Sequence, residues 1–277
     1  MRVLAWLMGL VLLCLGIYLQ IEVKTSAPER LESAPDDARA LPPEEPAAVA
    51  ALRAAIRNGE TDSWPEPELI KALSSVESAQ AVSVLDDLSL QTTDRDVFKQ
   101  ILQALETAGG VEAVRLLYRI GKKENDLAEL AAVRLSRIHD RAAAVALVDV
   151  LEREGGVGPF AAAATRALGR TRLRHYVPRL IELAREGDLG VRLAAVDGLG
   201  AIADSDALPI LIDLLRDPGA RVRRQAIRAL SRIRSPGAIE ALEGFLQTTP
   251  SPPPFEASLA QDSLARQRGV NPGPWRR

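Results

Sequence analysis

Residues 217–246 have the sequence DPGARVRRQAIRALSRIRSPGAIEALEGFL, and this stretch decides the fold. Its first half carries apolar residues at Val222, Ala226, Leu230 and Ile233. Because an α-helix has 3.6 residues per turn, positions spaced by four, four and three residues share one face of a helix. A Ser-Pro-Gly corner follows, and the apolar residues after it return to helical spacing. The stretch therefore predicts two short helices joined by a tight turn.

The same pattern recurs along the chain at a near-constant interval. The positions 31 residues earlier hold the matching residues Val191, Ala195, Leu199 and Ile202. Weaker copies precede them, with apolar series that start at Leu69, Val97, Leu127 and Phe160. A period of roughly 30 residues indicates stacked supersecondary units rather than one globular core.

Composition agrees with an all-α fold. Of the 277 residues, 47% are hydrophobic but only 4% are aromatic, which suits Ala, Leu, Val and Ile packed between closely spaced helices. No stretch alternates with the period of two that a half-buried strand requires. We predict an all-α solenoid of about seven hairpins over residues 45–268, followed by a flexible tail at 269–277.

Each hairpin pairs a first helix with a second helix, and neighbouring pairs must stack because one pair cannot bury its apolar face alone. First helices are predicted near residues 45–58, 79–89, 110–121, 141–153, 174–186, 206–216 and 237–247. Second helices are predicted near residues 65–77, 94–108, 126–138, 159–170, 189–202, 219–233 and 255–267.

The repeated residues resemble those of the HEAT-repeat family, close to the short bacterial type that also occurs in phycobilisome lyases. The second helix of such a repeat is similar to Asp217-Pro218, Val222-Arg223, Ala226, Ala229-Leu230 and Ile233. The preceding unit has Glu186 in place of the aspartate, no proline, and then Val191-Arg192. The resemblance covers about two-thirds of the chain and weakens toward its start. It implies an α-solenoid whose second helices line the concave side, and binding rather than catalysis.

The N-terminal segment, residues 1–23, predicts where the solenoid is located. Residues 3–23 contain no charge before Glu22, and a helix needs about 20 apolar residues to cross the hydrocarbon of a bilayer. We therefore predict a transmembrane anchor. A cleaved signal peptide is an alternative, with a small-residue site at 25–27. A lipoprotein modified at Cys14 is another, although a leucine precedes that cysteine where a small residue is needed.

Orientation and linker composition extend this prediction. Arg2 on a very short leading tail favours an N-terminus in the cytoplasm. The protein is then a single-pass protein of a bacterial inner membrane, with the solenoid in the periplasm. Residues 24–44 are rich in proline, alanine and acidic residues and lack apolar periodicity. Such a segment cannot bury enough surface to fold, so we expect a disordered tether.

Charge is distributed unevenly along the chain, whose net charge is −2. Residues 22–90 hold 6 Lys and Arg against 14 Asp and Glu, whereas residues 161–277 hold 18 against 12. On one second helix, Arg224, Arg228 and Arg232 follow a four-residue step and share a face.

Two further arginines extend this pattern into a predicted basic strip. Arg166 and Arg170 are equivalent to Arg228 and Arg232 two repeats earlier, and Asp197 interrupts the row. A basic strip on the second helices suits an acidic segment of a partner protein or an anionic polymer. The alternative is that these arginines are ordinary solvated surface.

Two other arginines are predicted to act between repeats. Arg192 and Arg223 are expected to pair with aspartates such as Asp188 and Asp217 in a surface ladder. Exposed pairs of this kind contribute about 0–1 kcal/mol each, so they would set register more than they stabilise the fold.

The chain lacks the usual components of an active site. It has two histidines, His139 and His175, a single cysteine, and no glycine-rich phosphate loop that follows a strand. We therefore expect no catalytic residues, no metal and no cofactor. Nucleic-acid binding is also not expected, because the net charge is slightly negative and aromatic residues are scarce.

Two classes of function follow from these observations. The first is a membrane-tethered scaffold whose solenoid groove binds a partner protein. The alternative is an assembly or maturation factor for an enzyme or an envelope complex, by analogy with the lyases that contain similar repeats. A scaffold would stay bound to its partner, whereas a maturation factor would release a modified client.

Overall fold

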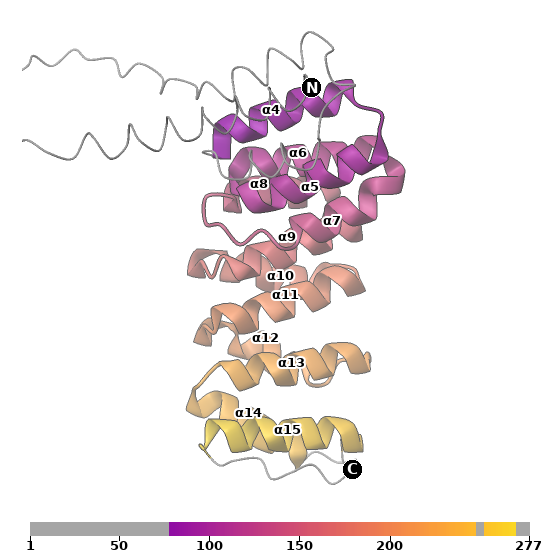
Figure 1. Cartoon of the computed structure of the whole chain (residues 1–277). Coiled ribbons are helices and arrows are strands. Elements are labelled where there is room, and N and C mark those ends of the chain that lie inside the picture. The colour runs from indigo at the N-terminus through magenta and orange to yellow at the C-terminus, as the bar shows by residue number, and fades with distance from the viewer. Residues whose placement is uncertain (1–77, 248–251, 270–277) are drawn as a thin grey trace, which may run out of the picture. The chain divides into compact units, whose positions relative to one another are not determined.

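The computed structural model describes residues 78–247 and 252–269, and all of them belong to the compact unit Glu45–Arg277. In these two ranges the chain forms twelve α-helices and no strand, with labels that follow Figure 1. The helices make six consecutive hairpins: α4 (Ser78–Gln91) with α5 (Arg95–Ala108), α6 (Gly110–Lys123) with α7 (Ala128–Leu135), α8 (Ala144–Glu154) with α9 (Gly158–Arg170), α10 (Val177–Glu186) with α11 (Leu189–Ile202), α12 (Leu208–Leu214) with α13 (Ala220–Arg232), and α14 (Pro236–Leu246) with α15 (Pro254–Gln267).

The predicted all-α solenoid is confirmed for these six hairpins. The first predicted hairpin, at 45–58 and 65–77, lies outside the described residues, as do the span at 3–23 and the tether at 24–44. Within the two described ranges, no helix combines the length and the apolar character that crossing a bilayer requires.

Three helices begin later than predicted because short 3₁₀ turns precede them. Asn125–Leu127, Arg174–Tyr176 and Ser205–Ala207 form these turns ahead of α7, α10 and α12. Pro178 and Pro209 are the second residues of α10 and α12. A proline has no N–H to donate and a fixed φ, so it is favoured in the first turn of a helix and not further inside it. The prolines therefore mark where these two α-helices start.

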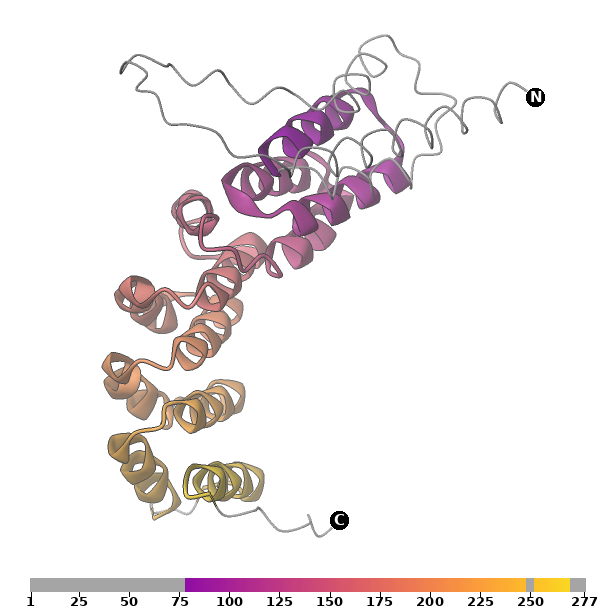
Figure 2. The same ribbon diagram turned by 60° about the vertical axis from the view of Figure 1, so that its left-hand side comes forward.

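The hairpins stack in two layers. Figure 2 shows α8, α10, α12 and α14 in one layer and α9, α11, α13 and α15 in the other. Within this unit the stack bends toward the layer of second helices, as the resemblance to HEAT repeats implies. The surface of that layer is the one on which the predicted basic strip lies.

Small residues let the second helices approach one another closely. A Cβ atom added to Gly169 of α9 would lie 2.3 Å from the Cα atom of Gly198 in α11. A Cβ atom added to Gly200 would lie 2.8 Å from the Cα atom of Ala229 in α13. Distances this short are not tolerated, so the backbones of adjacent second helices touch only because these residues are small.

The repeated apolar residues form the core that the hairpins share. The first three apolar residues of the two strongest copies of the pattern are fully buried. Relative exposures are 0% for Val191, Ala195, Leu199, Val222, Ala226 and Leu230. The predicted helix faces are thus the faces that pack against neighbouring hairpins.

The predicted arginine ladder exists, with one expected partner, one new partner and a deeper position. The guanidinium of Arg192 pairs with Asp217, one of the two expected aspartates, and not with Asp188. Arg223 binds Glu256 of α15 through two hydrogen bonds, Nε to Oε2 at 2.8 Å and Nη2 to Oε1 at 3.0 Å. Glu256 is only 3% exposed, so this pair is buried and the expectation of a weak surface ladder is wrong here.

Arg192 does not bind Asp188 because the Asp188 carboxylate is already hydrogen-bonded to backbone N–H groups. It caps the N-terminus of α11, where its Oδ1 accepts a hydrogen bond from the Val191 N–H at 2.8 Å. Its Oδ2 accepts from the Gly158 N–H at the start of α9, at 2.7 Å. The carboxylate therefore joins two consecutive second helices. The hydrogen bond from Val191, aided by that from Gly158, lowers the pKa of the Asp188 carboxyl.

Replacement of a core leucine tests the repeat register. Leu230→Ala removes a fully buried side chain and is expected to lower the free energy of unfolding by about 2–5 kcal/mol. Leu90, which is 67% exposed, provides the control Leu90→Ala, for which we expect little change. Chemical denaturation followed by circular dichroism measures both. Equal stability of the two variants would contradict the register.

The cap at Asp188 makes stability depend on pH. The pKa of the Asp188 carboxyl is lower in the folded protein than its value of 3.8 in the unfolded chain. The ionised carboxylate therefore stabilises the fold above pH 3.8, and this stabilisation is lost as the pH falls through the folded-state pKa. Asp188→Asn keeps the size of the side chain but removes its charge. We expect the variant to be less stable than the wild type at pH 7, with a gap that narrows below pH 3.8 in thermal melts. A gap that stays constant down to pH 2 would contradict this role.

Candidate functional site: a basic groove on the last hairpins

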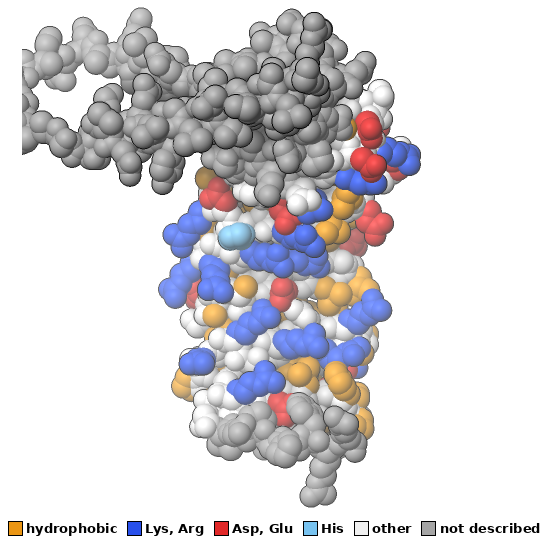
Figure 3. Space-filling view, viewed as in Figure 1, with side chains coloured by type: hydrophobic (Ala, Val, Ile, Leu, Met, Phe, Trp, Pro, Cys, Tyr) orange, Lys and Arg blue, Asp and Glu red, His pale blue; other side chains and the backbone are white. Residues whose placement is uncertain are grey.

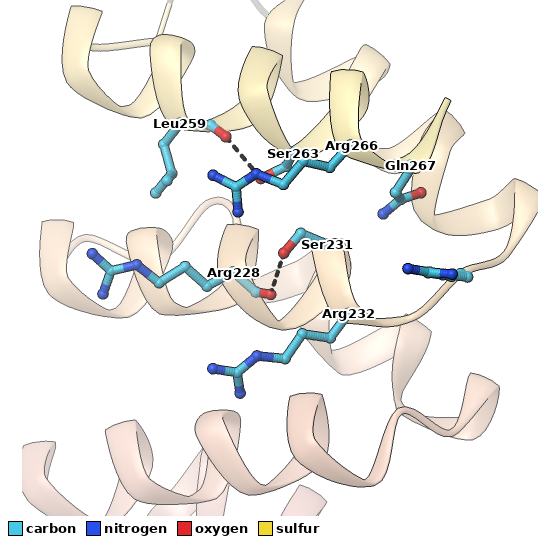
Figure 4. Close-up of a pocket in the computed structure, with 8 residues that line it drawn as sticks. Arg228, Ser231, Arg232, Leu259, Ser263, Arg266 and Gln267 are labelled. Carbon is cyan, nitrogen blue, oxygen red and sulfur yellow. Dashed lines mark hydrogen bonds between the residues drawn. The ribbon is translucent and has the colours of Figure 1, made fainter. Parts of the chain in front are cut away.

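A groove of about 550 Å³ lies between α13 and α15 on the layer of second helices (Figure 4). It is lined by polar side chains from both helices together with one leucine: Arg228, Ser231, Arg232, Arg234, Leu259, Ser263, Arg266 and Gln267. We call it the arginine groove. Four of its eight lining residues are arginines, and none is acidic.

Helix geometry places these side chains together. Arg228 and Arg232 are one turn apart on α13, so they point to the same side. Arg234 follows the end of that helix, and Arg266 comes from the last turn of α15. The Gln267 side chain connects the two helices, because its Nε2 donates a hydrogen bond of 2.9 Å to the Leu230 carbonyl.

The arginine groove carries more positive charge than its surroundings neutralise. Arg232 pairs with Asp197 of α11 at 2.9 Å. The two side chains are 46% and 34% exposed, and ion pairs that are this exposed are weak. Arg228, Arg234 and Arg266 form no ion pair with any residue that the structure describes. Several cationic groups in one hollow concentrate the positive potential there.

The arginine groove also contains hydrogen-bond acceptors. Ser231 Oγ donates its proton to the Arg228 carbonyl and Ser263 Oγ donates to the Leu259 carbonyl, both at 2.7 Å. Each hydroxyl oxygen is thus left with lone pairs only. Gln267 Oε1 is buried and accepts no hydrogen bond from the described part of the chain. Gln267 Oε1 and Ser263, which is 1% exposed, are closed to solvent, so Ser231 is the accessible acceptor of these three.

The structure brings together only part of the predicted strip. Of its five residues, Arg228 and Arg232 line the arginine groove. Arg224 lies one turn earlier, where its guanidinium stacks on the exposed Phe255 ring at 5.4 Å and its Nε donates to the Ala220 carbonyl.

The two arginines of α9 lie elsewhere on the layer. Arg166 is half-buried, and Arg170 donates a 3.0 Å hydrogen bond to the Ser136 carbonyl at the end of α7. Neither lines the arginine groove, and Asp197 of α11 accepts hydrogen bonds from Gln225 and Arg232 between the two groups. Figure 3 accordingly shows Lys and Arg side chains spread over this face with an acidic side chain among them, rather than one unbroken strip.

Sequence reasoning missed Arg234, Arg266 and Gln267. One signal was available for Arg266. If Ala260 and Leu264 of α15 are matched with Ala226 and Leu230 of α13, an offset of 34 residues, Arg266 takes the place of Arg232. Arg234 lies beyond its helix and outside the periodic pattern, so no spacing rule identifies it.

The two histidines lie apart from this site. Both His139 and His175 are exposed, in the segments that follow α7 and α9. Among the described residues, no group of three metal-ligating side chains gathers at either histidine or elsewhere.

The stacked hairpins define an α-solenoid, a class of helical-repeat scaffolds for protein interaction. A family model for HEAT repeats matches residues 146–220 and 177–261, which confirms the resemblance seen in the sequence. Residues 146–261 thus contain HEAT repeats.

Two further comparisons concern solved structures and curated proteins. Among solved structures, the crystal structure of an engineered protein from the Northeast Structural Genomics Consortium shares 23% sequence identity. The match covers 79% of this chain and 97% of that one, with a TM-score of 0.32. None of the curated proteins matches the chain significantly.

The Arg223–Glu256 pair holds α15, and thus one wall of the arginine groove, in place. Glu256→Ala leaves a guanidinium that is 19% exposed without its carboxylate, which we expect to cost about 2–4 kcal/mol. Because repeats contact only their neighbours, the loss falls on the last hairpin. Hydrogen exchange of α15 amides should speed up while that of α9 amides stays unchanged. Equal acceleration in both helices would contradict a local role.

Proposed function

We propose that this protein is a membrane-tethered scaffold that holds a partner protein against the layer of second helices, with the arginine groove as a principal contact. The observation that carries the proposal is the composition of that groove, four arginines and no acidic lining residue. Net positive charge in a hollow attracts an acidic partner and orients it. The HEAT repeats provide the extended surface that such a scaffold needs.

The membrane attachment is the second part of the proposal. Residues 3–23 would anchor the protein, and residues 24–44 would let the solenoid reach away from the bilayer. Arg2 supports an N-terminus in the cytoplasm, which places the solenoid in a bacterial periplasm.

A protein partner fits the groove better than a nucleic acid does. Proteins that hold single-stranded nucleic acid combine basic grooves with aromatic rings on which bases stack. The lining of the arginine groove has no aromatic residue. The chain as a whole has a net charge of −2, which does not favour binding to a polyanion over its full surface. We propose binding rather than catalysis as the protein's activity.

A crosslinking pull-down from membranes tests the proposal. The tagged full-length protein is expected to stay in the membrane pellet after an alkaline wash and to capture one or a few proteins. Arg228→Glu combined with Arg232→Glu should remove a captured partner, because two attractive charges become repulsive. Mass spectrometry of the captured proteins gives the readout.

The control for this experiment is the exposed Arg185 of α10, in the other layer. Arg185→Glu makes the same kind of charge change outside the groove and should leave capture intact. Identical capture by all three proteins would argue against the arginine groove as a contact. Recovery of the wild type in the soluble fraction would argue against the membrane anchor.

A further inference from the structure

We infer that the arginine groove binds a short extended peptide segment of the partner with acidic side chains at alternate positions, an acid-x-acid sequence. This inference rests on the proposed function and specifies the chemistry of its partner. Two properties of the groove support it: its charge and its dimensions.

The positive charge of the arginine groove favours an anionic ligand. Arg228, Arg234 and Arg266 have no carboxylate partner among the described residues, and Arg232 has only a weak one. Guanidinium groups bind carboxylates through two parallel hydrogen bonds, which is the strong form of a charge-assisted contact. Two or more carboxylates in one ligand would neutralise the cations that the fold leaves free.

The size of the groove favours a peptide over a simple anion, because a phosphate or sulfate ion would not fill about 550 Å³. Ser231 Oγ has already donated its proton to the Arg228 carbonyl, so it can only accept a hydrogen bond. A polypeptide carries one N–H per residue in addition to its carboxylates and can donate to this oxygen.

Dimensions fix the length and spacing of the segment. Along α15 the lining runs from Leu259 to Gln267, and eight residues at a rise of 1.5 Å span about 12 Å. An extended peptide rises about 3.3 Å per residue, so roughly four residues fill the groove. Arg228 and Arg232 are four residues apart, about 6 Å along α13. Alternate side chains of an extended peptide lie on one side at about 6.6 Å spacing, which places two acids opposite these two arginines.

Figure 4 supports an elongated ligand rather than a compact one. The labelled side chains lie along the two neighbouring helices, with Leu259 and Arg228 toward one end of the groove and Gln267 toward the other. Arg266 extends into the space between α13 and α15, Arg228 lies along α13, and Arg232 extends on the side of α13 that faces α11, where it pairs with Asp197. A ligand that runs along α13 can contact Arg228 and Arg266 together.

The test measures peptide binding by the purified full-length protein in detergent, using fluorescence anisotropy. The probe is a labelled peptide with the core Asp-Ala-Asp between glycines. The comparison peptides are Asp-Asp-Ala, with the same charge in a different spacing, and Asn-Ala-Asn, with the same shape and no charge. We expect the Asp-Ala-Asp peptide to bind tightest and the Asn-Ala-Asn peptide to bind about tenfold more weakly or worse.

Variants locate the binding to the groove. Arg234→Glu combined with Arg266→Glu should weaken binding of the Asp-Ala-Asp peptide about tenfold or more, while Arg185→Glu leaves it unchanged. Circular dichroism checks that all variants keep their helical signal. Arg266→Gln removes one charge without introducing repulsion and should weaken binding by a smaller factor.

Several outcomes would overturn the inference. Equal binding of the charged and uncharged peptides would remove the role of the carboxylates. Equal binding of the two spacings would remove the acid-x-acid pattern. Competition by inorganic phosphate at concentrations as low as those of the peptide would make the groove a plain anion site. Unchanged peptide binding by the arginine variants would place the site elsewhere.

The two proposals fail in different ways. If Arg228→Glu with Arg232→Glu loses the membrane partner but no acidic peptide binds the wild type, the scaffold stands and this inference fails. If the peptide binds and depends on Arg234 and Arg266, the inference stands, even where no partner is captured from membranes and the scaffold proposal fails.

Discussion

The close approach of successive second helices is the constraint on which the rest of the structure depends. Gly198 and Gly200 face opposite neighbours from α11, one against Gly169 and the other against Ala229. Because no side chain separates these backbones, the helices are held at a short spacing and each hairpin buries its apolar face against the next. The arginines that lie between second helices are brought near one another by the same spacing, so the geometry of the core also sets the geometry of the binding face.

The hairpin of α14 and α15 packs on its neighbour with an additional kind of contact. Besides the buried Ala260 and Leu264, the contact of α15 with α13 includes an ion pair: Arg223 binds Glu256, and the same guanidinium donates to the carbonyls of Asp217 and Pro218. A pair of this kind gives direction and register, where an apolar contact would allow the helix to shift. The groove between the two helices therefore has a defined width.

The sequence was sufficient to predict most of the described fold and two of the four arginines that line the groove. The helices are periodic in apolar residues, so positions such as Leu199 and Leu230 identify their buried faces directly. Charged side chains are less predictable, because an arginine near a helix surface can bind any of several partners within its reach. Arg192 binds Asp217 because the Asp188 carboxylate already caps α11. The sequence does not show which carboxylate is occupied in this way, because that depends on how the segments pack. Arg234 lies outside any periodic segment, and only the packed structure reveals its place in the groove.

The arginine groove differs from the rest of the surface because it gathers four arginines in one hollow with no acidic lining residue. In earlier hairpins some basic side chains bind carboxylates about one repeat away, as in Arg134 with Glu106 at 2.9 Å and Lys122 with Glu154 at 3.0 Å, whereas exposed arginines such as Arg185 form no ion pair with the described residues. These contacts neutralise charge where hairpins meet. In the last hairpins Arg228 and Arg266 line one groove without such partners among the described residues, and like charges at close range oppose folding. The buried core and the Arg223–Glu256 pair stabilise the stacking there without an ion pair from either arginine. The acidic partner that we propose would neutralise this charge, which no carboxylate of the described residues does for Arg228 and Arg266.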